Sequence, residues 1–142
     1  MVEMSREEVE ELLRDAVIGR IAFARDGEPY CIPMPFLYHG GALYFRLPDE
    51  GRKGEMMCAN PRVCFEVDSF TPDLSEYSSV IAEGELVEVT DLGEKSEARR
   101  LSDGKYSRLR AGSRRGNGRP PQPLEALPVR KLVIHTSAGR TK

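Results

Sequence analysis

The chain has 142 residues, of which 39% are hydrophobic and 31% are charged, and its formal net charge is −2. This length supports one hydrophobic core, the composition excludes a disordered chain, and no apolar run approaches the ~20 residues of a membrane-spanning helix. The acidic first residues lack a secretory signal and the three cysteines lack zinc-ligand spacing, so we expect one cytoplasmic domain over residues 1–142, with no metal and no membrane contact.

The first half of the chain predicts one helix followed by two hairpins. Ser5 and Glu8 have the spacing of a capping box, and apolar residues then recur at helical intervals over residues 6–15. From Gly19 the hydrophobic period changes to two, and the Asp-Gly pair at residues 26 and 27 is typical of a tight hairpin turn. The strands expected here begin at Gly19 and, beyond the turn, cover residues 29–38 and 42–47.

The second half predicts two helices, three strands and one irregular segment. The helices are expected over residues 52–59 and 92–101, and the strands over residues 63–68, 77–89 and 129–136. Gly84 falls inside the longest of these strands and predicts a bulge or a sharp bend there. Glycine, proline and arginine dominate residues 103–128, so we expect a basic, irregular excursion. Six strands with short turns and few helices predict a mainly β fold, a small antiparallel barrel that is closed or partly closed.

Charge is unevenly divided along the chain. Residues 103–142 carry ten basic and two acidic side chains, whereas residues 1–102 carry eleven basic and 21 acidic side chains. The basic segment is open to three interpretations: a solvated loop, a flap that brings positive charge to an anionic substrate or cofactor, or a nucleic-acid arm. Tyr106 is the only aromatic residue of the excursion, so nucleic-acid binding is not expected.

Two prolines make residues 31–36 (Cys-Ile-Pro-Met-Pro-Phe) an unusual strand. Residues two apart direct their backbone groups to the same strand edge, so Pro33 and Pro35 remove two donors from one edge. That edge cannot form a complete ladder of hydrogen bonds. It belongs either to an ordinary edge strand that proline protects from aggregation, or to a groove in which exposed backbone meets a ligand.

A basic pair marks the start of the helix at residues 52–59. The surrounding sequence, Gly-Arg-Lys-Gly at residues 51–54, lies where a strand loop meets a helix N-terminus, which offers backbone N–H groups and the positive end of the helix dipole. Arg52 adds a guanidinium fork and Lys53 a mobile ammonium, both suited to a phosphate monoester. The alternative is two solvated charges on a surface helix. Neither a P-loop nor a dinucleotide-binding glycine motif is present.

Taken in order, these segments resemble the FMN-binding split-barrel superfamily around pyridoxamine 5′-phosphate oxidase. Within it, the likeness is greatest to the flavoproteins related to nitroimidazole-resistance proteins. The likeness is carried by G-R-I-A-F-A-R-D-G-E-P-Y, I-P-M-P-F-L-Y, G-A-L-Y-F, G-R-K, N-P-R-V-C-F-E-V-D and Y-S-S-V-I-A-E-G. It runs from residue 4 to residue 89 and resumes weakly over the last strand. It implies a six-stranded antiparallel split barrel of the FMN-binding type.

The resemblance also implies FMN as the cofactor and a set of contacts to it. The proline-containing strand would lie along the flavin, the end of the third strand close to its ring and ribityl phosphate, and the basic pair on the phosphate. A serine of the fifth strand would meet the flavin across a dimer interface, because in this superfamily the cofactor lies between two subunits of a homodimer. The residues so implied are Ile32, Pro33, Met34, Pro35, Arg46, Leu47, Arg52, Lys53 and Ser79. Close relatives often carry histidine in place of Arg46 and a small hydroxyl residue in place of Leu47.

The function expected from this site is that of an FMN-dependent oxidoreductase acting on a small organic substrate. The residues identify no catalytic group, and His39 and His135 have no acidic or cysteine partner at metal-ligand spacing. Two alternatives stay open. One is a flavin-binding protein without turnover, serving as a carrier, an electron-transfer partner or a sensor. The other is a split barrel that holds a deazaflavin or haem instead of FMN.

Overall fold

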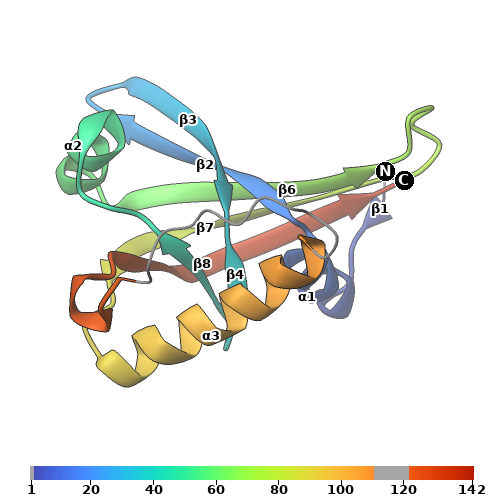
Figure 1. Cartoon of the computed structure of the whole chain (residues 1–142). Coiled ribbons are helices and arrows are strands. Elements are labelled where there is room, and N and C mark those ends of the chain that lie inside the picture. Colours follow the sequence, from blue (N-terminus) through green and yellow to red (C-terminus); the bar gives the residue numbers. More distant parts are fainter. Residues whose placement is uncertain (1, 111–121) are drawn as a thin grey trace.

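A curved antiparallel sheet and three α-helices make up residues 2–110 and 122–142, which the computed structural model describes (Figure 1). The helices are α1 (Arg6–Asp15), α2 (Gly51–Ala59) and α3 (Leu92–Leu109), and a short 3-10 turn, η1, covers Leu124–Ala126. The strands are β1 (Val2–Glu3), β2 (Ile18–Arg25), β3 (Glu28–Pro35), β4 (Leu37–His39), β5 (Ala42–Arg46), β6 (Arg62–Phe70), β7 (Tyr77–Glu88) and β8 (Val129–Thr141).

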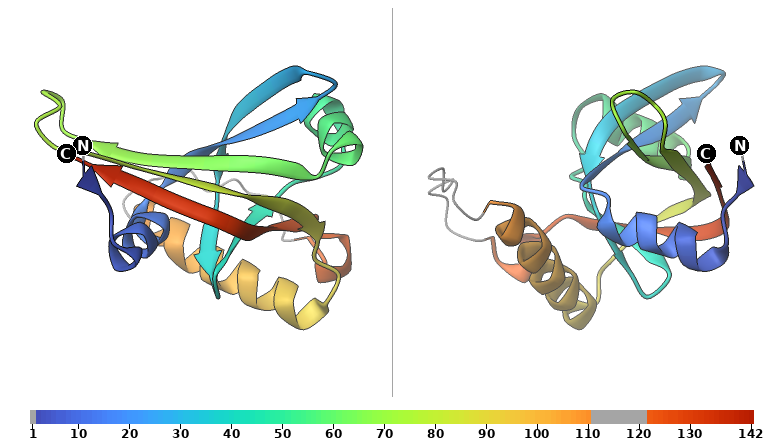
Figure 2. Two further views of the ribbon diagram at one scale, coloured as in Figure 1. Left: turned by 180° about the vertical axis from the view of Figure 1, so that it is seen from behind. Right: turned by 90° about the vertical axis from the view of Figure 1, so that its right-hand side faces the viewer.

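The sheet curls into a barrel because its two edge strands are almost continuous in the chain. The strand order is β3-β2-β6-β7-β8-β5-β4, every neighbouring pair is antiparallel, and β1 adds to β8. The edge strands β3 and β4 are separated in sequence by Phe36 alone. A single residue advances a strand by only about 3.3 Å, so the two edges of the sheet have to meet at this point. Figure 2 shows the resulting ring of strands end-on. The predicted antiparallel split barrel is confirmed.

The number of strands differs from the six predicted. Residues 29–38, expected as one strand, form β3 and β4, and the two-residue strand β1 was not anticipated. The break follows from backbone chemistry. Pro35 has no N–H for a ladder, and at Phe36 the chain leaves its partner β2 for its new partner β5.

Two predicted boundaries are also wrong. The helix expected to end at residue 101 continues as α3 to Leu109, so the first part of the predicted irregular excursion 103–128 is helical. Residues 111–121 of that excursion lie outside the described residues. The last strand, expected to end at residue 136, runs to Thr141, because its second half pairs with β7 and β1.

Other local predictions are confirmed. Ser5 and Glu8 form the capping box of α1: the Ser5 hydroxyl accepts from the Glu8 N–H at 3.2 Å, and the Glu8 carboxylate accepts from the Ser5 N–H at 3.0 Å. The pairing of β7 with β8 shifts register between Glu83 and Gly84. A side chain at residue 84 would place its Cβ 1.9 Å from the carbonyl oxygen of Val133, so this bulge requires glycine.

The inner face of the barrel holds one apolar core. The side chain of Phe65 is fully buried, and its ring centroid lies 4.9 Å from that of Phe36 and 5.1 Å from that of Phe45. Helix α1 adds Val9 and Leu13 to this core. In Figure 1, α2 lies beside the β2–β3 hairpin, and α3 lies outside the barrel near β4. Among residues 2–110 and 122–142, no helix combines the length and hydropathy that a membrane span requires.

Candidate functional site

The barrel wall is interrupted between the end of β3 and the end of β5, a place we call the split. Among the described residues β3 pairs with β2 only, as the prolines predicted. Continuing the β4–β5 register would bring Pro35 opposite Arg46, yet the ladder starts two residues further on, at Leu37 and Tyr44. The free edge of β3 and the end of β5 therefore flank an opening in the sheet.

Helix α2 begins next to this edge strand. Gly51 enters the helix with a φ of +66°, a conformation that favours glycine. The N-cap residue Glu50 makes no side-chain capping hydrogen bond, so the first-turn N–H groups receive no cap from it. The guanidinium carbon of Arg52 lies 4.8 Å from the centre of the Tyr30 ring on β3. The helix start predicted to bind phosphate is thus joined directly to the predicted flavin strand.

The other end of α2 is also fixed to the β2–β3 hairpin. The side-chain amide of Asn60, which follows the helix, donates to the carbonyl oxygen of Ala24 on β2 at 3.0 Å. Lys53 is half-buried, whereas Arg52 is exposed. Both ends of the short helix are therefore tied to the hairpin, and its basic first turn has a defined position.

The end of β5 holds Arg46 and Leu47 in different environments. Arg46 is exposed, and its guanidinium donates to the side-chain oxygen of Gln122. The backbone carbonyl of Gln122 accepts in turn from Arg99 of α3 at 2.8 Å. Leu47 is fully buried in the core, and its carbonyl oxygen accepts from Arg130 at 2.7 Å. The side chain of Leu47 therefore faces the barrel interior, and its contact with a cofactor stays a prediction.

The predicted residues of β3 divide between the two faces of the sheet. Ile32 and Met34 face the interior, Met34 being buried, whereas Pro33 and Pro35 are exposed on the outer face. Ser79 of β7 lies on this outer face too, but β2 and β6 separate β7 from β3. Three strand spacings amount to roughly 14 Å along the sheet. The structure therefore brings β3, the end of β5 and the start of α2 together, and it does not bring Ser79 to them within one chain.

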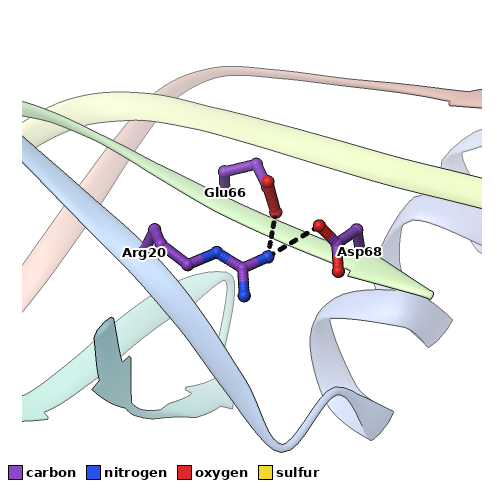
Figure 3. Close-up of polar contacts among 3 residues, drawn as sticks. All are labelled: Arg20, Glu66 and Asp68. Atoms are coloured by element: carbon purple, nitrogen blue, oxygen red, sulfur yellow. Dashed lines mark hydrogen bonds and ion pairs between the residues drawn. The ribbon is translucent and has the colours of Figure 1, made fainter. Parts of the chain in front are cut away.

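An ion-pair cluster lies on the outer face between Pro33 and Ser79 (Figure 3). One nitrogen of the Arg20 guanidinium contacts Glu66 Oε1 at 2.5 Å and Asp68 Oδ2 at 2.8 Å. The hydrogen bond to Glu66 is the main cause that raises the pKa of Arg20. All three side chains are partly exposed, so the cluster adds little to stability and mainly orients the charges of this face. Opposite charges at facing strand positions were its only signal in the sequence.

Tyr44 of β5 is hydrogen-bonded to α3. Its hydroxyl donates to Glu94 at 2.7 Å, and Lys131 contacts the same carboxylate oxygen at 2.7 Å. Burial and the carboxylate raise the pKa of Tyr44 to about 12. The hydrogen bonds from Lys131 and Tyr44 lower the pKa of Glu94. This cluster fastens α3 to β5 and β8.

Two residues of α3 reach the split, and sequence reasoning missed their role. The Tyr106 hydroxyl lies within 3.0 Å of both backbone groups of Phe36, and the Lys105 ammonium lies 3.0 Å from its carbonyl oxygen. Burial raises the pKa of Tyr106 and lowers that of Lys105 to about 8. No motif marks these residues, because their role depends on a helix that glycine and arginine content argued against.

A pocket of about 280 Å³ lies between the turn of the β2–β3 hairpin and α2, at the opposite end of β3 from the split. Of the predicted site residues, only Arg52 lines it. Its other charged residues are Arg25, Asp26, Glu28 and Glu55. With three carboxylates against two guanidiniums, the pocket disfavours an anion, so we do not expect the phosphate to enter it, although Arg52 lines it.

The sequence matches a known family over nearly its whole length. Residues 5–140 match the family described as pyridoxamine 5′-phosphate oxidase. An uncharacterised protein of Rhizobium meliloti (strain 1021) is 32% identical over 87 residues, which are 61% of this chain and 56% of that protein. The match therefore spans little more than half of that relative.

Solved structures share the fold. A FAD-binding protein from Mesorhizobium loti is 29% identical and has a TM-score of 0.74, over 99% of this chain and 97% of that chain. A proposed 5-nitroimidazole antibiotic resistance protein from Bacteroides thetaiotaomicron has a TM-score of 0.76 at 20% identity, over 99% of this chain and 86% of that chain. With its split barrel and its match over residues 5–140, this chain belongs to the pyridoxamine 5′-phosphate oxidase family.

Proposed function

We propose that this protein binds FMN at the split and acts as an oxidoreductase on a small organic substrate, as a homodimer in the cytoplasm. The observation that carries the proposal is the joining of a basic helix N-terminus to a free strand edge, through Arg52 and Tyr30. Arg52, Lys53 and the first-turn N–H groups of α2 would hold the phosphate. The edge of β3 over residues 32–35 would contact the ring system. Bound FMN would supply hydride or electron transfer.

A flavin is further supported by the relative from Mesorhizobium loti, which is described as FAD-binding. The choice of FMN over FAD rests on the pocket beyond Arg52. FAD carries a second phosphate. If FAD extended into this pocket, that phosphate would meet the carboxylates of Asp26, Glu28 and Glu55. Like charges at such a position oppose binding, whereas a single terminal phosphate avoids them.

A homodimer is supported by the position of Ser79. Its side chain shares the outer face with Pro33 and Pro35 but lies three strands away from them. A second copy whose outer face covered the split would bring its own Ser79 to the flavin. Ile18 and Ile81 are apolar side chains on this outer face and are 46% and 48% exposed, which suits burial against another copy.

A cytoplasmic location is supported by the cysteines. All three are free thiols, which suits a reducing compartment.

The cofactor is tested by extraction from the native protein, followed by mass measurement. The expected result is a yellow protein that releases FMN, one per chain. FAD, a deazaflavin or haem in the extract contradicts the assignment of FMN, and colourless protein that stays colourless after incubation with FMN contradicts flavin binding altogether.

Turnover is tested separately. NADH or NADPH is expected to bleach the bound flavin, and a small organic acceptor is expected to restore its colour within the same mixture. The competing candidate is a flavin-binding carrier or sensor without turnover. Arg46 favours it, because close relatives often carry histidine there, and any chemistry that depends on that histidine would be lost in this chain. Bleaching without reoxidation by any small acceptor would favour this second candidate.

A further inference from the structure

Phe36 lies where the chain passes from one edge strand of the sheet to the other. It is the single residue between β3, which pairs with β2, and β4, which pairs with β5. Its side chain is buried in the core against Phe65. Its backbone N–H and C=O belong to neither ladder, and buried backbone groups without partners are costly. Something outside the sheet has to satisfy them.

Tyr106 of α3 does so with one hydroxyl. The N–H of Phe36 donates to this hydroxyl oxygen at 2.9 Å. The hydroxyl is itself 2.8 Å from the carbonyl oxygen of Val17, the residue before β2, and 3.0 Å from that of Phe36. It has one hydrogen to donate, and Lys105 already serves the Phe36 carbonyl, so the hydroxyl is free to donate to Val17. Tyr106 thereby ties Phe36, the residue between β3 and β4, to the start of β2.

Lys105 completes the contact from the next position of α3. Its ammonium donates to the carbonyl oxygen of Phe36 at 3.0 Å and lies 4.0 Å from the centre of the Phe36 ring. It also lies 5.2 Å from the ring of Tyr106. The amine is half-buried, and Asp15 at the end of α1 is the acidic group that acts on it. A cation held between two rings and a carbonyl is a fixed contact, unlike the usual solvated lysine.

We propose that Lys105 and Tyr106 are positioning residues that set the width of the split, with the last turns of α3 acting as a clasp on Phe36. Pro35, a predicted cofactor contact, precedes Phe36 directly. A shift of the backbone at Phe36 therefore moves the free edge of β3 relative to β5. The effect on cofactor affinity rests on the proposed function. The effect on the strands does not, because it follows from the hydrogen bonds alone.

The test uses Tyr106→Phe, which removes only the hydroxyl, and Lys105→Met, which removes the charge and keeps a long apolar stem. Amide hydrogen exchange in the full chain is read over residues 28–39 and over β7 and β8. Tyr77→Phe is the matched control, since it removes a hydroxyl from β7 outside the clasp. Lys105→Arg tests rescue, because arginine keeps the positive charge and the donors.

In Tyr106→Phe we expect exchange at Phe36 and along β3 to accelerate about tenfold, with β7 and β8 unchanged. FMN affinity should fall by a similar factor in Tyr106→Phe and Lys105→Met and recover in Lys105→Arg, while Tyr77→Phe behaves as the wild type. Exchange over residues 28–39 that matches the wild type in both clasp variants overturns the proposal. Accelerated exchange in a chain that never binds flavin supports the clasp and refutes the proposed function instead.

Discussion

The guanidinium carbon of Arg52 lies over the ring of Tyr30, 4.8 Å from the ring centre. This contact joins the first turn of α2 to the first half of β3, although the two residues are 22 positions apart in the chain. It places the predicted phosphate group at one end of β3, and the predicted ring contacts at residues 32–35 follow along the same strand. The proposed site therefore runs along β3, with the phosphate near Tyr30 and the ring system near residues 32–35.

Replacing Tyr30 tests whether this ring positions Arg52. Tyr30→Leu removes the face on which the guanidinium rests, a contact worth about 0.5–1 kcal/mol at an exposed site. We expect FMN to bind about two- to fivefold more weakly, measured by quenching of flavin fluorescence. Tyr30→Phe keeps the ring and should bind FMN as the wild type does. Equal affinity in all three proteins would show that Arg52 does not depend on Tyr30.

Two glycine substitutions predict opposite changes in stability. Gly84→Ala would place a Cβ 1.9 Å from the carbonyl oxygen of Val133, so the bulge between β7 and β8 must shift, at a cost of about 1–3 kcal/mol. Gly104→Ala meets no atom within 4 Å and lies inside α3, so it should stabilise the protein by about 0.5–1 kcal/mol. Urea denaturation measures both changes. A stabilising Gly84→Ala would contradict the bulge geometry.

Lys105 predicts a pH-dependent stability. Burial lowers its pKa from the ordinary 10.5 to about 8. Between these two pH values the unfolded chain holds a proton on this amine that the folded chain has lost, so the free energy of unfolding rises with pH across this window. Because solvent still reaches the amine, we expect a rise of about 1 kcal/mol. Tyrosines and other lysines also titrate here, so the comparison with Lys105→Met isolates the effect. Identical pH slopes in the two proteins would contradict the prediction.

The barrel was predictable wherever local chemistry decides the structure. Alternating apolar residues identified β2 and β6, the two prolines of β3 identified a free edge, and Gly84 identified a bulge. Each of these signals acts within one strand or one ladder. For that reason each could be interpreted without knowing which elements are neighbours in space.

The clasp and the extent of α3 were not predictable in this way. Gly104 and the arginines after it argue against a helix, yet α3 continues to Leu109. Contacts of Lys105 and Tyr106 with Phe36, about seventy residues earlier in the chain, accompany this extension. The break of the predicted 29–38 strand at Phe36 likewise depends on two partners, β2 and β5, that lie next to opposite edges of the sheet.

A charge on the outer face tests the proposed dimer. Ile81 is 48% exposed in the single chain, so Ile81→Asp should leave the fold intact and place an unpaired carboxylate in the proposed interface. We expect sedimentation to show a monomer and FMN to bind at least about tenfold more weakly. The control is Leu74→Asp, an exposed loop position with a φ of +59° that aspartate tolerates. A dimer that persists in Ile81→Asp would place the interface elsewhere.

The central claim, that the basic start of α2 holds a flavin phosphate, is tested most directly by comparing FMN with riboflavin, which lacks the phosphate. The wild-type protein should bind FMN at least about 100-fold more tightly, since two charge-assisted contacts are each worth about 1.5–3 kcal/mol. In Arg52→Ala with Lys53→Ala this preference should fall to the small part that the first-turn N–H groups provide, whereas Arg6→Ala with Arg14→Ala, which removes the same charge from α1, should keep it. Equal affinity of the wild-type protein for FMN and riboflavin would contradict the assignment.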